Sequence, residues 1–157
     1  MGTGDMGHAV GRALIKEGFR VITALIGRSE RSCKLAKLGG LEDVGSLENL
    51  IKESDLFLSI MPPHEALRFA SLSCNIIDKT GSKTVYADFN AIAPGTSKEI
   101  GGVFNKSGLA FIDGSIIGPP PGKNIITRMY SSGYESETLL SLSGPNLNFV
   151  SLGSEIG

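Results

Sequence analysis

The chain has 157 residues, of which 41% are hydrophobic and 20% charged, and its formal net charge is −1. That length suits one domain with its own core, and the composition is ordinary for a globular protein. A nearly neutral chain has no general field that attracts DNA or an anionic membrane, so we expect neither as a partner. No apolar run is long enough to cross a bilayer.

The two cysteines, Cys33 and Cys74, are isolated, and neither has a partner at metal-ligand spacing. This usage is typical of reduced thiols in a cytoplasmic protein, and we expect no metal site. The first seven residues contain three glycines and an aspartate rather than an apolar stretch, which is unlike a signal peptide.

Segments with helical spacing alternate along the chain with short apolar runs typical of buried strands. Helices are predicted over 6–18, 30–38, 47–52, 64–77, 95–104 and 135–142, and strands over 20–26, 41–44, 55–61, 84–87, 109–112, 125–130 and 148–152. Such alternation predicts an α/β fold, a Rossmann-like doubly wound and mostly parallel sheet covered on both faces. No linker interrupts the pattern, so residues 1–157 form one predicted domain.

A glycine-rich motif, GTGDMG over residues 2–7, opens the first predicted helix and fits G-x-G-x-x-G. In dinucleotide-binding folds the first glycine makes a tight turn, and the second lets the backbone approach a pyrophosphate. The third lets helix and strand pack, while the helix N-terminus attracts the anion. The alternative is a plain glycine turn. The predicted contacts to a dinucleotide are Gly2, Thr3, Gly4, Asp5 and Met6.

The same motif normally follows a central β-strand. There is no room for that strand ahead of residue 2, so we expect a sheet without its first strand, in a chain that is part of a longer one. In the usual order the strand lies between those predicted at 20–26 and 55–61. Its absence leaves unpaired backbone groups that lower stability and invite strand addition by another chain.

The end of the second predicted strand bears on the choice of nicotinamide cofactor. NAD enzymes usually have an acid there that binds the ribose 2′-hydroxyl. Here Arg28, Ser29 and Arg31 follow the strand, and no acid stands at its end. Guanidinium and hydroxyl groups suit a 2′-phosphate, so we predict NADP, with NAD still possible. The alternative is that both arginines belong to a solvated helix start.

Three more segments follow predicted strands: MPP at 61–63, DFNAIAP at 88–94 and DGSIIGP at 113–119. With the glycine motif, they resemble the β-hydroxyacid dehydrogenases, which have a Met-x-Pro turn, a D-x-[SN]-x-x-x-P segment and a D-A-P-V-S-G-G segment. The resemblance covers nearly the whole chain. It extends to the 6-phosphogluconate dehydrogenase and 3-hydroxyisobutyrate dehydrogenase group.

The resemblance implies roles for particular residues. Met61, Pro62 and Pro63 would lie beside the nicotinamide ribose, and Asn90 would bond the nicotinamide carboxamide or a substrate oxygen. Ile117 and Gly118 stand in the substrate-binding segment. However, Ile117 replaces a serine that the family often has, which puts the usual substrate class in doubt.

Several of these residues have structural alternatives. Asn90 also suits an Asx turn ahead of the helix that starts near Pro94. We expect Asp88 and Asp113 to cap or brace turns, and His64 to face solvent at a helix start.

The implied activity is hydride transfer between NADP(H) and a small hydroxy or oxo acid. The catalytic lysine of these enzymes lies on a long helix after this domain, beyond Gly157, and Lys106 and Lys123 do not match its position. We therefore expect no catalytic residue in this chain, no activity from it alone, and a homodimer formed through a helical domain that follows. The alternative is a non-catalytic nucleotide-binding or regulatory module of the same fold.

Overall fold

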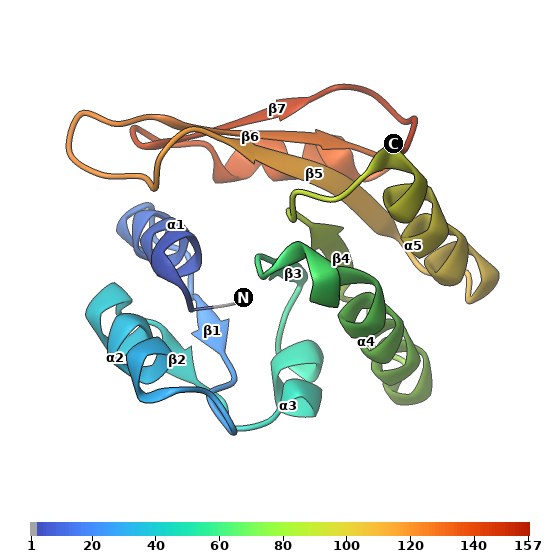
Figure 1. Cartoon of the computed structure of the whole chain (residues 1–157), viewed down its shortest axis with the longest axis horizontal. Helices are drawn as coiled ribbons and strands as arrows, with labels where there is room; N and C mark the ends of the chain where they lie inside the picture. The colour runs from blue at the N-terminus through green and yellow to red at the C-terminus, as the bar shows by residue number, and fades with distance from the viewer. Residues whose placement is uncertain (1–2) are drawn as a thin grey trace.

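The computed structural model describes residues 3–157 (Figure 1). Its α-helices are α1 (Asp5–Lys16), α2 (Glu30–Gly39), α3 (Leu47–Lys52), α4 (Ala66–Thr80) and α5 (Pro94–Lys106). Its strands are β1 (Ile22–Thr23), β2 (Glu42–Asp43), β3 (Leu56–Ser59), β4 (Val85–Asp88), β5 (Phe111–Ile117), β6 (Thr127–Ser132) and β7 (Leu147–Ser151). Two 3₁₀ helices are η1 (Pro63–Glu65) and η2 (Ser136–Leu142). None of the helices in this part of the chain is long and apolar enough to span a membrane.

The strands form two sheets, a pair β1-β2 and a five-stranded sheet of order β3-β4-β5-β6-β7. All pairs are parallel except β5 with β6. The predicted α/β fold with a mostly parallel sheet is therefore confirmed. The register places Ser59 beside Asp88 and Asp88 beside Asp113, so the carboxyl ends of β3 and β4 meet the middle of the longer β5 at one edge.

The antiparallel pair joins the tail to the rest of the sheet, whereas the tail strands β6 and β7 themselves pair in parallel across η2. Residues 118–126, which join β5 to β6, contain no helix. A parallel crossover usually needs a dozen or more residues, most often with a helix, whereas a loop this short returns the chain antiparallel.

Side chains from the two faces of the sheet enter two separate apolar clusters. Leu58 and Ala87 pack against α1, whereas Phe57 and Tyr86 pack against α3, α4 and α5. On the second face Phe57 stacks on Tyr86, with ring centroids 5.3 Å apart and planes 11° apart. Both faces are covered, as the continuous apolar runs of β3 and β4 predict.

Local sequence explains where the helices start, and where one of them differs from the prediction. Ser46 caps α3 by accepting a hydrogen bond from the Asn49 amide at 3.1 Å. The segment 135–142, predicted as an α-helix, is the 3₁₀ helix η2. There the hydroxyls of Thr138 and Ser141 donate to carbonyls three residues earlier, at 2.6 and 2.8 Å, a spacing that suits the tighter helix.

Candidate functional site

The glycine turn lies at the N-terminus of α1, where Gly4 is the N-cap residue. Gly2 lies outside the described residues. Thr3 is buried, and its hydroxyl has no hydrogen-bond partner among them. A Cβ added to Gly4 would meet no atom within 4 Å, and its φ of −76° suits any residue. The fold itself therefore does not require glycine there, and the open space beside free helix amides suits a phosphate.

Asp5, in the first turn of α1, is paired with Arg31 of α2. Nη2 of Arg31 lies 2.6 Å from Oδ1 and 2.8 Å from Oδ2 of Asp5, and both side chains are largely exposed. The hydrogen bond from Arg31 lowers the pKa of Asp5. The predicted cofactor residue Arg31 thus has its charge matched within the protein. Met6 is partly buried and packs against the cluster that contains α1.

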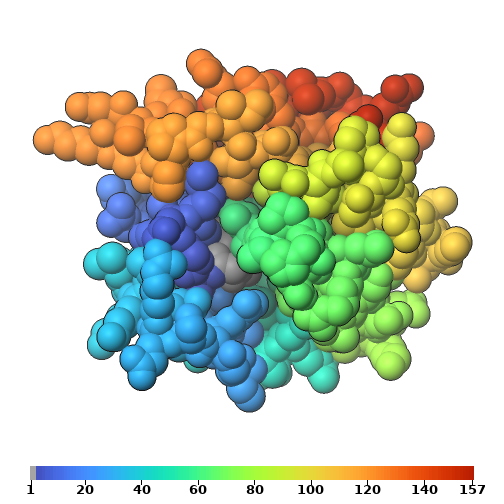
Figure 2. Space-filling model, viewed as in Figure 1, coloured from blue at the N-terminus to red at the C-terminus, as the bar shows by residue number. Residues whose placement is uncertain are grey.

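Arg28 and Met61, predicted as cofactor contacts from separate motifs, line one hollow of about 320 Å³. Arg28 follows β1 and Met61 follows β3, which belong to different sheets. A second arginine, Arg68 of α4, lines the same hollow, and none of the residues that line the hollow is acidic, although Arg68 is itself paired with Glu65. Figure 2 shows the face where α1 and α2 (blue) and the start of α4 (green) oppose one another.

A tight turn presents Arg28 at the end of β1. The Arg28 amide donates to the Leu25 carbonyl at 2.9 Å, and Gly27 has a φ of +72°, a conformation that favours glycine. Arg28 forms no ion pair with any described residue. Ser29 caps α2 by accepting a hydrogen bond from the Ser32 amide at 3.3 Å. Of the two, Arg28 has its polar group free for a ligand.

Sequence analysis did not single out Arg68. Its guanidinium donates to Glu65 Oε2 through Nε at 2.9 Å and through Nη2 at 2.5 Å, so its charge, like that of Arg31, is matched within the protein. An arginine on an amphipathic helix is usually a solvated surface residue. Arg68 lines the same hollow as Arg28 because of the way α4 packs, which the sequence does not reveal.

Asn90 is the centre of a buried hydrogen-bond network. Its Oδ1 accepts from the Met61 amide at 2.6 Å, and its Nδ2 donates to Ser59 Oγ at 3.1 Å and to Asp88 Oδ2 at 2.9 Å. The Asn90 amide donates to Asp88 Oδ1 at 2.9 Å, which is an Asx turn made by Asp88. Both side-chain hydrogens of Asn90 are used within the protein. Asn90 therefore holds the Met61–Pro62 turn in place.

Asp88 is fully buried and accepts both of these bonds from Asn90. Burial raises the pKa of Asp88, the bonds from Asn90 oppose this increase, and the nearby charge of Asp113 adds to it. Its carboxyl group braces the turn, as the sequence predicts for it.

A second hollow, of about 200 Å³, lies on another side of Asn90 and is also lined by Asp113. Two further lining residues, Ser97 and Ser131, are buried, and their hydroxyls have no partner among the described residues. Asp113 Oδ2 accepts from the Gly157 amide at 3.0 Å. The sequence carried no signal for the two serines, because isolated serines are common on helices and strands alike.

The remaining predicted residues line neither of these hollows. Ile117 is 58% exposed at the end of β5, and Gly118 follows it with a φ of +115°. Neither residue lines the hollow that contains Asn90, so the structure does not bring the three predicted substrate residues into one pocket. Pro62 and Pro63 are exposed at the start of η1, next to His64, which is exposed as expected.

Comparison with known proteins identifies this arrangement. The model of the NAD binding domain of 6-phosphogluconate dehydrogenase matches residues 1–137. The chain belongs to this family. As a 6-phosphogluconate dehydrogenase-type domain it is a nicotinamide-dinucleotide-binding domain.

Two curated relatives of this NAD-binding domain are informative. An uncharacterized 28.5 kDa protein of Methanothermus fervidus is 27% identical over 157 residues, which is all of this chain and 58% of the relative. Mitochondrial 3-hydroxyisobutyrate dehydrogenase of Rattus norvegicus is 26% identical over 119 residues, which is 75% of this chain and 35% of the enzyme. The chain thus spans between about a third and three fifths of the length of these relatives.

Solved structures agree with this assignment. One is a conserved protein of unknown function, described as structurally similar to 3-hydroxyacid dehydrogenases. It matches with a TM-score of 0.84 at 26% identity, and the match spans 99% of this chain and 57% of that protein's chain. Another is the V8 variant of imine reductase from Myxococcus stipitatus in complex with NAD⁺. It matches with a TM-score of 0.79 at 19% identity, and the match spans 99% of this chain and 54% of the reductase chain. The latter likeness shows the fold.

Proposed function

We propose that this NAD-binding domain prefers NADP(H) and serves an oxidoreductase that transfers hydride between NADP(H) and a small hydroxy or oxo acid. The observation that supports the cofactor choice is the pair Arg28 and Arg68 at one hollow without an acidic lining residue in the described chain. The guanidinium of Arg28, which has no ion-pair partner among the described residues, favours a phosphate monoester over a ribose hydroxyl, and Arg68, although paired with Glu65, adds a second donor group at the same hollow.

The fold accommodates either cofactor. Imine reductase from Myxococcus stipitatus is described in complex with NADP⁺, and its V8 variant in complex with NAD⁺. The preference is therefore set by side chains near the adenosine ribose rather than by the fold. Arg28 lies in the turn that follows β1, in the segment where an NAD enzyme usually has an acid, and no described residue forms an ion pair with it.

Each part of the site has a role in this proposal. The amides at the start of α1 and the orphan hydroxyl of Thr3 bind the pyrophosphate. Arg28, with Arg68 opposite, binds the 2′-phosphate. Asn90 fixes the turn at Met61, which borders the nicotinamide ribose. The bound cofactor supplies the hydride, and this chain positions it.

The proposal names the substrate only by its chemical class. Mitochondrial 3-hydroxyisobutyrate dehydrogenase is among the relatives, which supports a small hydroxy acid. Within this chain Ile117 and Gly118 are the proposed substrate contacts, and Asn90, whose side-chain groups are used by Met61, Ser59 and Asp88, contributes by fixing the Met61 turn. The proton-transferring residue is proposed to be a lysine outside these 157 residues, and the working enzyme a cytoplasmic homodimer.

Calorimetry with NADPH and NADH tests the cofactor choice. NADPH should bind more tightly, and Arg28→Ala should weaken NADPH binding by about 1–3 kcal/mol while leaving NADH nearly unchanged, because a charged hydrogen bond to the phosphate is lost. At about 1.4 kcal/mol per factor of ten, this is on the order of a 5- to 100-fold change in Kd. Arg68→Ala should act in the same direction.

Arg128→Ala, an exposed arginine of β6 that does not line this hollow, is the matched control and should bind like the original chain. Tighter binding of NADH, or an Arg28→Ala variant with an unaltered preference, contradicts the proposal.

A further inference from the structure

An ion pair joins the start of α1 to the start of α2, directly beside the glycine turn. Nη2 of Arg31 donates to both carboxylate oxygens of Asp5, and the two residues are 26 positions apart in the chain. Asp5 is the first residue of α1, next to the N-cap residue Gly4. Its carboxylate therefore belongs to the first turn of the helix, whose amides have no partner within the helix.

The pair contributes little to the stability of the fold. The side chains of Arg31 and Asp5 are 67% and 66% exposed. Exposed ion pairs stabilise proteins only slightly, because water screens the attraction and both side chains lose conformational freedom. The larger effect of the pair is on the charge beside the glycine turn.

An unpaired carboxylate at this position would oppose the binding of a dinucleotide. Asp5 is ionised near neutral pH, because the hydrogen bond from Arg31 lowers its pKa. The partial positive charge of a helix N-terminus favours an anion, and an acidic side chain in the first turn already uses part of that attraction. The negative charges of a pyrophosphate would then be repelled by Asp5 at short range. Arg31 cancels the charge that causes this repulsion.

The space next to Asp5 has two features that suit a phosphate. A Cβ added to Gly4 would meet no atom within 4 Å. Thr3 is only 4% exposed, and its hydroxyl has no partner among the described residues. A buried hydroxyl without a partner lowers stability, so this group indicates a ligand beside the first turn of α1.

We propose that Arg31 is a positioning residue, which holds and neutralises the carboxylate of Asp5 so that the pyrophosphate can bind at α1. Arg31 does not contact the cofactor in this proposal, unlike Arg28, which is proposed to bind the 2′-phosphate. The inference rests on the proposed nucleotide site. It concerns the part of the cofactor that NADPH and NADH have in common, so it predicts equal effects on both.

Calorimetry of the 157-residue chain with NADPH and with NADH, in about 0.1 M salt, tests the proposal. Arg31→Ala leaves Asp5 unpaired and should raise both Kd values by the same factor, about three- to tenfold. In about 0.5 M salt this factor should decrease, because the repulsion is screened.

A second substitution separates the charge of the pair from its role as a link between two helices. Asp5→Asn combined with Arg31→Ala removes both charges, so both Kd values should return to within about twofold of the original. This double variant also lacks the link between α1 and α2. Recovery of affinity therefore supports the neutralisation of Asp5 and excludes a purely structural role.

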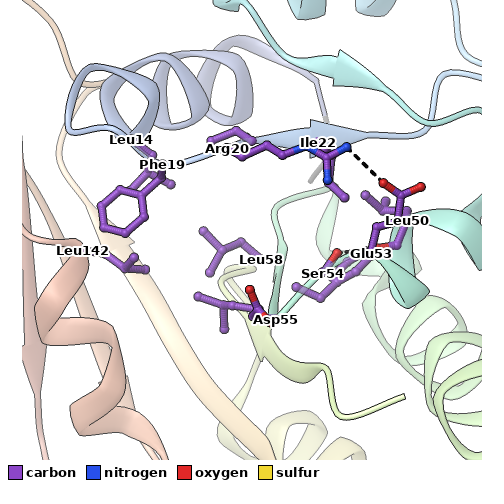
Figure 3. A pocket seen from close by; sticks show the side chains of 13 residues that line it. Leu14, Phe19, Arg20, Ile22, Leu50, Glu53, Ser54, Asp55, Leu58 and Leu142 are labelled. Atoms are coloured by element: carbon purple, nitrogen blue, oxygen red, sulfur yellow. Dashed lines mark hydrogen bonds and ion pairs between the residues drawn. The ribbon is translucent and has the colours of Figure 1, made fainter. Parts of the chain in front are cut away.

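Arg20→Ala is the matched control, because it removes one positive charge from another exposed ion-pair cluster. Arg20 Nη2 lies 2.6 Å from Glu42 Oε1 and 3.0 Å from Glu53 Oε2, and Figure 3 shows its guanidinium directed toward Glu53. Arg20 follows the far end of α1, a helix of 12 residues that is about 18 Å long. Charges are screened over about 10 Å in 0.1 M salt, so Arg20→Ala should leave both Kd values unaltered.

Four results would overturn the proposal. Weaker binding of NADPH alone in Arg31→Ala would make Arg31 a direct ligand of the 2′-phosphate. Weaker binding that the double variant does not recover would make the pair a link between helices. Unchanged affinity in a folded Arg31→Ala variant, checked by circular dichroism, would show that the charge of Asp5 has no effect. Binding of neither dinucleotide by the original chain would instead refute the proposed nucleotide site, and this inference with it.

Discussion

The side chain of Asn90 holds the main chain of Met61, with its Oδ1 2.6 Å from the Met61 nitrogen. This bond joins the segment after β4 to the segment after β3, 29 residues apart in the chain. The same side chain donates both of its hydrogens to Ser59 and Asp88. Two motifs predicted as separate ligand contacts are therefore parts of one rigid network.

Replacement of Asn90 should consequently affect both stability and cofactor binding. Asn90→Ala leaves the Met61 amide, the Ser59 hydroxyl and one Asp88 oxygen without this partner, at a cost of about 1–3 kcal/mol for a buried unpaired group. Urea unfolding measures the lower free energy of unfolding, and calorimetry with NADPH measures the weaker binding. Asn105→Ala, at an exposed position of α5, should alter neither quantity. A stable Asn90→Ala variant would show that the network is not required.

Gly4→Val should abolish cofactor binding while leaving the protein folded. A Cβ added at this position meets no described atom within 4 Å and needs no left-handed backbone, so the variant should fold with at most a small loss from the weaker N-cap. Its side chain occupies the space assigned to the pyrophosphate, so NADPH binding should disappear in calorimetry. Gly102→Val, at another open position in α5, should keep full affinity. Unchanged affinity in a folded Gly4→Val variant would place the nucleotide elsewhere.

Asp88 should give the protein a distinctive dependence on pH. Its pKa is raised in the folded state, chiefly by burial, so the folded protein binds its proton more tightly than the unfolded chain, whose pKa is near 3.8. The contribution of Asp88 to the free energy of unfolding is therefore greatest below that pH. It decreases as the pH rises from there through the raised folded pKa.

Exposed carboxylates such as Glu42 and Glu65 have lowered pKa values because Arg20 and Arg68 bond them, and they act in the opposite direction. The measurement is therefore a difference between the urea unfolding curves of the original chain and of Asp88→Asn at several pH values. The stability of the original chain relative to Asp88→Asn should fall with rising pH in this window. A constant or rising difference would contradict the raised pKa.

The sequence by itself determined the local features of this protein. Helix α3 has the predicted bounds, because Ser46 is a capping residue immediately before a helical apolar pattern. The glycine turn starts α1, and the continuous apolar runs of β3 and β4 predicted a sheet buried on both faces. Hydrophobic period, caps and turn residues act over a few neighbouring positions, so they can be seen without the fold.

Only the tertiary structure decided which distant groups meet. Arg28 and Arg68 come from a turn and a helix 40 positions apart, and they share one hollow because α4 packs beside the end of β1. The free donors assigned to Asn90 proved to be used by Ser59 and Asp88. The antiparallel pairing of β5 with β6 follows from strand pairing across the whole sheet. Pairing and packing depend on the whole chain, and a pattern within one segment does not specify its partner.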